Sequence, residues 1–227
     1  KISAVRIGKG YLAGTAKEVW VPDDKTQQRR DIFHPHQKSV KRSTKARNSL
    51  LSYLSDNGVR LKSGTALVND PSGSEKQLRE SNEWSVSQWS VVEGMLLELR
   101  QAEEARRHWR TIIAQEVAAD AELLRLMRLC GVREIVAFAL AAIIGDIKRF
   151  ARPGSLVKYV GLNPAFDNSG KQQWQGGIGG HGRKDLRSLL VQAAQSLMRS
   201  GYELAQWGKK LLARKGLYTL AVAAVAR

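Results

Sequence analysis

The chain has 227 residues, of which 37 are Lys or Arg and 21 are Asp or Glu, so its formal net charge is +16. A chain of this length can bury a core in one large or two small domains. A charge this positive indicates a polyanionic partner such as nucleic acid, because each phosphate that is neutralised releases condensed counterions. A basic protein of the ribosomal type, or one that is merely soluble, is the alternative.

Cysteine content and hydropathy exclude two further classes of protein. The single cysteine, Cys130, rules out an internal disulfide and fits a reducing cytoplasm. The longest apolar run, residues 135–144, is about half as long as a membrane-spanning helix, so no membrane is expected. The chain has no initiator Met and stops within an apolar stretch at Arg227, so we expect it to be a fragment at both ends.

The positive charge is distributed unevenly. Residues 1–60 contain 13 Lys or Arg against 5 Asp or Glu, and residues 121–227 contain 17 against 6. Residues 61–120 contain 7 against 10 and are slightly acidic. Nucleic acid should therefore contact the two flanking regions rather than the middle of the chain.

The first region begins with a predicted helix over residues 1–15. Val19, Trp20 and Val21 then predict a short buried strand that Pro22 ends. A second helix, capped by Asp23 or Asp24, runs to Leu54, and Pro35 should kink it or split it in two.

The outer face of this second helix is strongly basic. Its side chains include Lys38, Lys41, Arg42 and Lys45, with almost no acids among them. A run of like charges is often only a solvated face, but the near absence of acids here favours contact with phosphates.

The middle region is predicted to be a loop followed by a long helix. Glycine, proline and aspartate in residues 61–75 are expected to interrupt regular secondary structure there. Residues 84–119 then show one apolar stripe at steps of three or four, and such a helix is roughly 50 Å long. It is either a packed core helix or a coiled-coil arm, and the mixed charges beside the stripe favour the arm.

The third region begins with two short apolar helices, over residues 120–129 and 134–144, joined by a turn at Gly131. This pattern is typical of a helix-hairpin-helix, whose turn offers backbone N–H groups to a phosphate. Arg133 stands where the usual second small residue would be. A plain pair of helices within a core is an equally good interpretation.

A short helix is predicted from Pro153 to Tyr159, stopped by Gly161. The glycines between residues 163 and 182 exclude a helix there and predict a small β-hairpin with loops. Three further helices are expected, over residues 184–200, 203–213 and 217–227.

Ser169 is the candidate nucleophile, because a serine in an exposed, glycine-flanked loop presents its hydroxyl freely. The cationic or polar side chains that follow it could bind a phosphate, and His181 could protonate a leaving oxygen. These side chains are Lys171, His181, Arg183, Lys184 and Arg187. Taken alone, a Ser-Gly pair is more often a simple turn. His34 and His36 are isolated, so the sequence predicts no zinc site, and no carboxylate pair suggests magnesium.

Several segments of the third region resemble one family. They include residues 143–150 (IIGDIKRF), 156–164 (LVKYVGLNP), 179–187 (GGHGRKDLR) and 190–194 (LVQAA), together with Cys130-Gly131-Val132 and Ser169-Gly170. In this order they are similar to the C-terminal domain of insertion-sequence transposases that pair a RuvC-like DEDD domain with a serine-bearing domain. Some members of this family are bridge-RNA-guided recombinases. Residues 19–23 and the basic helix after them resemble the end of the RuvC-like domain.

The resemblance implies a fold and three regions. The chain would be mainly α, with a truncated RuvC-like α/β remnant over residues 1–60 and a loop and coiled-coil arm over 61–119. Residues 120–227 would form a serine transposase domain with a helix-hairpin-helix and a small β-hairpin. The partners would be double-stranded DNA, a guide (bridge) RNA and further copies of the chain in a dimer or tetramer, in the cytoplasm of a bacterium or archaeon and associated with the nucleoid.

The resemblance also implies a mechanism. The hydroxyl of Ser169 would attack a DNA phosphodiester and form a phosphoserine link, assisted by Mg²⁺ on four acidic residues. Three of these would precede Lys1, and Ser3 stands where the last acidic ligand is expected, so no metal ligand lies in this chain. The fragment alone should therefore be inactive. Two alternatives remain, a non-catalytic helix-hairpin-helix scaffold that binds nucleic acid and a protein-interaction module built on the arm.

Overall fold

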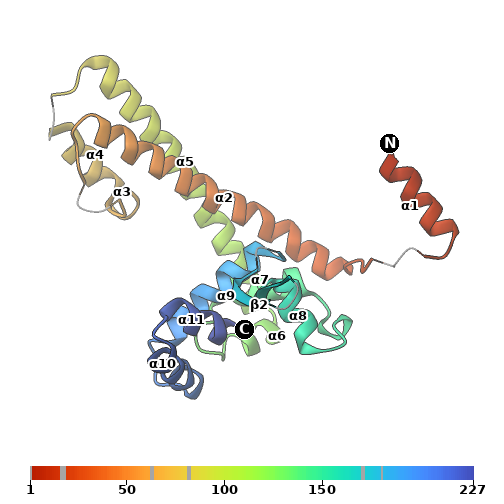
Figure 1. The fold of residues 1–227 in the computed structure, drawn as a ribbon. Coiled ribbons are helices and arrows are strands. Elements are labelled where there is room, and N and C mark those ends of the chain that lie inside the picture. The colour runs from red at the N-terminus through yellow and green to blue at the C-terminus, as the bar shows by residue number, and fades with distance from the viewer. Residues whose placement is uncertain (1, 16–18, 62–63, 81–82, 170–171, 180) are drawn as a thin grey trace.

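The computed structural model describes residues 2–15, 19–61, 64–80, 83–169, 172–179 and 181–227. Two long helices lie side by side and form a rod that projects from a body of shorter helices (Figure 1). The N-terminal helix α1 (Ile2–Leu12) stands apart from both in this view. The described residues are mainly helical, as the sequence predicts.

The strand predicted at residues 19–21 is wrong. No regular structure occurs between residues 19 and 23, and Val19 and Val21 are 84% and 79% exposed. A three-residue run cannot form a strand without a neighbour, and residues 1–60 contain no strand within the described part of the chain. Only Trp20 of this run is partly covered.

Helix α2 (Asp24–Asp56) is a single element of 33 residues. Asp23 caps it by accepting a hydrogen bond from the Thr26 amide at 2.6 Å. Of the two outcomes expected at Pro35, a kink or a split, the split does not occur. Proline removes one backbone hydrogen bond, but the adjacent Phe33 and His36 are buried, and this packing holds both sides of the missing bond in place.

The predicted loop over residues 61–75 is also wrong in part, because it contains α3 (Ala66–Asn69) and the start of α4 (Pro71–Glu80). Proline is favourable in the first turn of a helix, and Asp70 accepts a hydrogen bond from the Gly73 amide at 3.0 Å. Leu67 and Leu78 are buried against the rod. The breakers in this segment therefore begin a helix rather than prevent one.

Helix α5 (Val86–Ala118) begins with a capping box between Ser85 and Gln88. It packs antiparallel to α2, so that Gln88 donates to Asn57 at one end of the pair and Arg29 donates to Asp120 at the other. We call this pair the arm. The predicted apolar stripe is correct from Val92 to Ala102. Beyond Ala102 the prediction placed Ile112 and Glu116 on the stripe, whereas the buried positions lie one residue later.

Beyond Ala102 the buried side chains of α5 are Ile113 and Val117, whereas Ile112 is half-buried and Glu116 is exposed. The stripe is covered mainly by α2 of the same chain. Leu50 and Leu54 of α2 join the core at the distal end of the arm, and Phe33 joins the core at the end near the body.

The body surrounds helix α7 (Glu134–Ile144), whose Ala137, Phe138 and Ala139 are fully buried. The predicted helices and the hairpin of this region are all present. The other elements are α6 (Ala121–Leu126), the short 3₁₀ helix at Ile147–Arg149, α8 (Pro153–Val160), β1 (Pro164–Ser169), β2 (Gln172–Ile178), α9 (Lys184–Leu197), α10 (Glu203–Lys215) and α11 (Tyr218–Ala226). Strands β1 and β2 pair antiparallel.

Candidate nucleic-acid interface

The hairpin that carries Ser169 is supported by two glycines. Gly161 ends α8 with a φ of +81°, and Gly182 precedes α9 with a φ of +91°. A Cβ on Gly161 would lie 1.9 Å from the carbonyl oxygen of His181, and one on Gly182 would lie 2.7 Å from the Gly161 nitrogen. Only glycine allows the end of α8 and the start of α9 to approach this closely.

Arg187 fixes the same junction. Its Nη1 lies 2.9 Å from the His181 carbonyl oxygen and 3.2 Å from those of Gly161 and Gly179. These three carbonyls belong to the segments that flank the hairpin. Arg187, predicted to bind phosphate, thus uses one end of its guanidinium to hold the backbone together.

Arg183 is also engaged within the chain. It forms a two-point ion pair with Asp185, with Nη2 to Oδ2 at 2.7 Å and Nε to Oδ1 at 3.1 Å. This hydrogen bonding raises the pKa of Arg183 above its ordinary value. Burial alone would raise the pKa of Asp185, but the bonds from Arg183 and from the Leu186 amide outweigh it and lower that pKa. The pair orients the first turn of α9.

The remaining residues predicted at this site differ in what the structure says of them. The side chains of His181 and Lys184 are exposed at the start of α9. Ser169 is the last residue of β1 and is paired in register with Gln172, and its side chain lies outside the description. Lys171 lies outside the described residues altogether. The hairpin and the start of α9 thus follow one another in the chain, and Arg187 holds the segments that flank the hairpin together.

Gly131 packs against α9. With a φ of +86°, its position would bring a Cβ within 2.4 Å of the Ala193 carbonyl oxygen, so the turn between α6 and α7 is closely apposed to that helix. The Val132 amide donates to the Leu129 carbonyl at 3.0 Å and is used within the turn. Arg133 is exposed at the start of α7. Gly131 thus has a packing role, and Arg133 is the side chain of this turn that solvent reaches.

The basic face of α2 lies on the outside of the arm. Lys38, Lys41, Arg42 and Lys45 are exposed and follow one another at steps of one to four residues. None of the four makes a hydrogen bond or ion pair with the described part of the chain. These charges therefore remain available to an external anion.

The inner side of the arm holds a buried polar layer. Glu103 is 4% exposed, accepts a hydrogen bond from the Ser43 hydroxyl and pairs with Arg106 at 3.0 Å. His36 is buried nearby, and burial, together with the positive charges of Arg106 and Arg110, lowers its pKa. Ser43, Glu103 and Arg106 thus bind one another, whereas the buried Nδ1 of His36 has no hydrogen-bond partner among the described residues.

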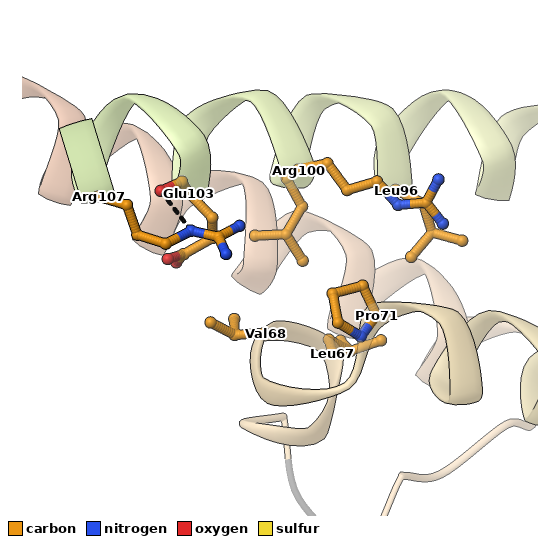
Figure 2. Close-up of a pocket in the computed structure, with 8 residues that line it drawn as sticks. Leu67, Val68, Pro71, Leu96, Arg100, Glu103 and Arg107 are labelled. Atoms are coloured by element: carbon orange, nitrogen blue, oxygen red, sulfur yellow. Dashed lines mark hydrogen bonds between the residues drawn. The ribbon is translucent and has the colours of Figure 1, made fainter.

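A small pocket lies between helix α5 of the arm, helix α3 and the start of α4 (Figure 2). Its volume is about 10 Å³, which is room for a single water. Leu67, Val68 and Leu96 line it together with Arg107, whose Nε donates to the Glu103 carbonyl. The pocket is therefore a packing gap and not a site for a small-molecule substrate.

Sequence reasoning missed a cluster that joins the segment before α2 to the body. The Arg149 guanidinium lies 4.1 Å from the ring centre of Trp20 and 4.6 Å from that of Tyr159. Arg30 donates to the Ala142 carbonyl at 2.8 Å and also faces Trp20. Trp20, two residues before Pro22, was the available signal, but nothing in the sequence identifies its partners.

The described residues contain no group of three or more His, Cys, Asp or Glu side chains that could hold a metal ion. Ser3 lies in α1. None of the described helices combines the length and apolar character needed to cross a membrane.

The geometry is that of a basic helical protein whose unpaired cations are exposed on an arm and beside a small hairpin. Comparison with known proteins shows a similarity to one family. Residues 123–209 match the family model described as "Transposase IS116/IS110/IS902 family". The matched segment runs from α6 into α10 and includes the whole hairpin. The chain is therefore related to transposases of that family.

Curated relatives carry similar names. The chain is 28% identical over 137 residues to the transposase for insertion sequence element IS1111A of Coxiella burnetii, covering 59% of this chain and 38% of that protein. It is 32% identical over 115 residues to a "Probable family 20 transposase" of Pseudomonas aeruginosa, covering 49% and 34%. It is 29% identical over 181 residues to the transposase for insertion sequence element IS1328 of Yersinia enterocolitica, covering 77% and 52%. The matches thus span from a third to about half of these relatives.

Proposed function

We propose that this chain is part of a DNA transposase that cuts and rejoins strands through a covalent serine–phosphate intermediate at Ser169. The observation that carries the proposal is the family match over residues 123–209, which contains the hairpin with Ser169 and the basic start of α9. Double-stranded DNA is the proposed substrate, and a guide RNA and further copies of the chain are proposed partners.

In the proposed step, the Oγ of Ser169 forms a bond to a DNA phosphorus atom and the bond from that phosphorus to a deoxyribose oxygen breaks. The number of phosphoester bonds stays the same, so no other energy source is required. The serine proton passes to a base, and in this proposal His181, which is exposed at the start of α9, protonates the leaving oxygen. Rejoining is the reverse of this step with a different deoxyribose hydroxyl.

The cations near the hairpin would stabilise the charge that develops on phosphorus. Lys184 is exposed at the first turn of α9, where the backbone N–H groups of the helix also favour an anion. Arg183 and Arg187 contribute differently, by fixing the frame that holds the hairpin and helix together. Magnesium, when bound, would supply further charge neutralisation.

The test is covalent trapping. A transposase of full family length that carries this chain, supplied with magnesium, DNA ends and guide RNA, should yield a protein–DNA adduct that survives denaturation. Ser169→Ala should abolish the adduct while DNA binding persists. Ser188→Ala, which changes an exposed serine of α9 in the same region, is the matched control and should leave the adduct unchanged. An adduct that persists in Ser169→Ala would overturn the proposal.

A further inference from the structure

Helix α10 has one packed face and one exposed face. Ala205 and Gly208 are buried, and a Cβ on Gly208 would lie 2.4 Å from the Met198 Sδ and 2.7 Å from a Val225 methyl, so this face lies directly against α9 and α11. The opposite face carries Trp207, which is 48% exposed. The arrangement leaves an indole ring accessible on the side of α10 that faces away from α9 and α11.

Cations follow this indole along α10. Residues 204–227 contain five Lys or Arg and no Asp or Glu, and the nearest acid, Glu203, is at the first turn of α10. Lys210 and Arg214 follow Trp207 by three and seven residues, so helical geometry places them on the same exposed face. Lys209 differs, because its Nζ donates to the Ser200 carbonyl at 2.9 Å.

Lys210 and Arg214 make no hydrogen bond or ion pair with any residue that the structure describes. A face intended for another protein is usually poor in lysine and other charged groups at its centre. An uncompensated positive charge beside an exposed aromatic ring instead matches the surfaces that bind single strands, where bases stack on aromatic side chains and cations follow the phosphates.

We propose that the exposed face of α10 binds an unpaired strand of nucleic acid, with Trp207 stacking on a base and Lys210 and Arg214 contacting phosphates. A duplex is a poorer ligand for this face, because its bases are already stacked on one another and their flat sides are covered. Tyr218, which is 44% exposed, follows the turn at Gly216 that ends α10. This site is separate from the serine chemistry and does not depend on it.

The test compares three probes of one sequence, a single-stranded RNA, a single-stranded DNA and the corresponding DNA duplex, bound by the 227-residue chain. Trp207→Ala should weaken single-strand binding roughly 5- to 100-fold, the range expected for the loss of one stacked base. Duplex binding should change less than about twofold. Trp207→Phe should restore part of the single-strand affinity, because phenylalanine retains a ring for stacking.

The cations give an independent readout. The double variant Lys210→Gln/Arg214→Gln should lower the slope of log affinity against log salt by about 1.4 for a single strand, since each phosphate contact contributes about 0.7. Lys209→Gln is the matched control, because Lys209 lies two residues from Trp207 and so on a different side of the helix, where its Nζ is held at the Ser200 carbonyl, and it should change the slope much less. A preference for the RNA or the DNA probe identifies the natural strand, and either result supports the site.

Three results would overturn the proposal. One is unchanged single-strand affinity in a Trp207→Ala variant whose circular dichroism shows that it is folded. Another is an equal loss of affinity for the duplex. The third is a Trp207→Ala variant with a smaller mass in sedimentation and unaltered nucleic-acid binding, which would show that this face contacts protein.

Discussion

Two clusters of cations that resemble each other in the sequence have different environments in the structure. On α2, Lys38, Lys41, Arg42 and Lys45 extend into solvent without any partner in the described part of the chain. At the start of α9, Arg183 is paired with Asp185, and Arg187 lies against three carbonyl oxygens. Both clusters are basic, yet only the first has all its charges available.

This difference shows that a run of cations has two separate uses. An exposed lysine adds little to folding, but it can release counterions when it neutralises a phosphate. An arginine that satisfies backbone carbonyls is part of the fold, and its removal leaves those carbonyls without a partner. Substitutions in the two clusters should therefore affect different measurements, binding for α2 and stability for α9.

Gly161→Ala should show the largest effect on stability. The φ of +81° disfavours alanine, and its Cβ would lie 1.9 Å from a backbone oxygen, so α8 and α9 would have to separate. We expect a loss of about 3–5 kcal/mol in the free energy of unfolding measured with urea. Gly216→Ala is the matched control, because its φ of +68° is similar but its surroundings are open. That variant should lose only about 1–2 kcal/mol, and an equal loss in both would show that the contact with His181 is unimportant.

The quadruple variant of α2, with glutamine at Lys38, Lys41, Arg42 and Lys45, tests the other cluster. Duplex DNA affinity should fall on the order of 100-fold at low salt, and the salt slope should decrease by about 3 to 4. The free energy of unfolding should change by less than about 1 kcal/mol, because these side chains are exposed and unpaired. Titrations of labelled duplex at several salt concentrations measure both quantities, and an unchanged slope would remove α2 from the DNA interface.

The sequence predicted much of the fold where local signals agreed with tertiary packing. The helix over residues 134–144 and the stop at Gly161 are both confirmed. The predictions failed where the outcome depends on distant partners. A β-branched run at Val19 to Val21 is no strand without a neighbour, and α2 continues through Pro35 because both sides are packed.

The candidate site was predictable only as a set of residue types. The pattern from Gly179 to Arg187 indicated a basic element beside the hairpin, which is correct. Nothing in that pattern could show that Arg187 contacts the carbonyls of Gly161 and Gly179, because this contact depends on how α8 and α9 approach each other. How many of these cations remain available to bind a phosphate therefore cannot be counted from the sequence, because it depends on contacts made in the folded chain.

Arg187→Met should have an intermediate effect. Methionine retains the apolar stem but leaves three carbonyl oxygens without their donor, and we expect a loss of about 2 kcal/mol in the free energy of unfolding. Lys184→Gln, three residues earlier and exposed, should change that free energy by less than about 0.5 kcal/mol. Thermal or urea unfolding followed by circular dichroism distinguishes the two. If both variants have the same stability, then Arg187 is as free as a surface lysine.

The smallest expected effect concerns Asp120, which joins the arm to the body. Its carboxylate lies 2.9 Å from Lys25 Nζ and 2.5 Å from Arg29 Nη2. The hydrogen bond from Lys25, aided by the Glu122 and Leu123 amides against the effect of burial, lowers the pKa of Asp120 from 3.8 to about 2. Because the folded-state pKa lies below the unfolded one, the ionised carboxylate stabilises the protein above pH 3.8, and this contribution is lost as the pH falls through about 2.

Asp120→Asn tests that contribution without removing the cap, since asparagine is also a favourable N-cap residue. At pH 5 the variant should be less stable by roughly 1 kcal/mol, a value kept small because Lys25 is largely exposed and water screens its charge. The difference between the two proteins should narrow as the pH falls below 4, because the Asp120 carboxyl of the unfolded chain is then protonated while the native one stays ionised down to about pH 2, which favours unfolding. Urea unfolding at pH 5, 4 and 3 measures it. A difference that stays constant over this range would mean that the charge of Asp120 does not hold the arm to the body, and that only its hydrogen-bonding geometry does.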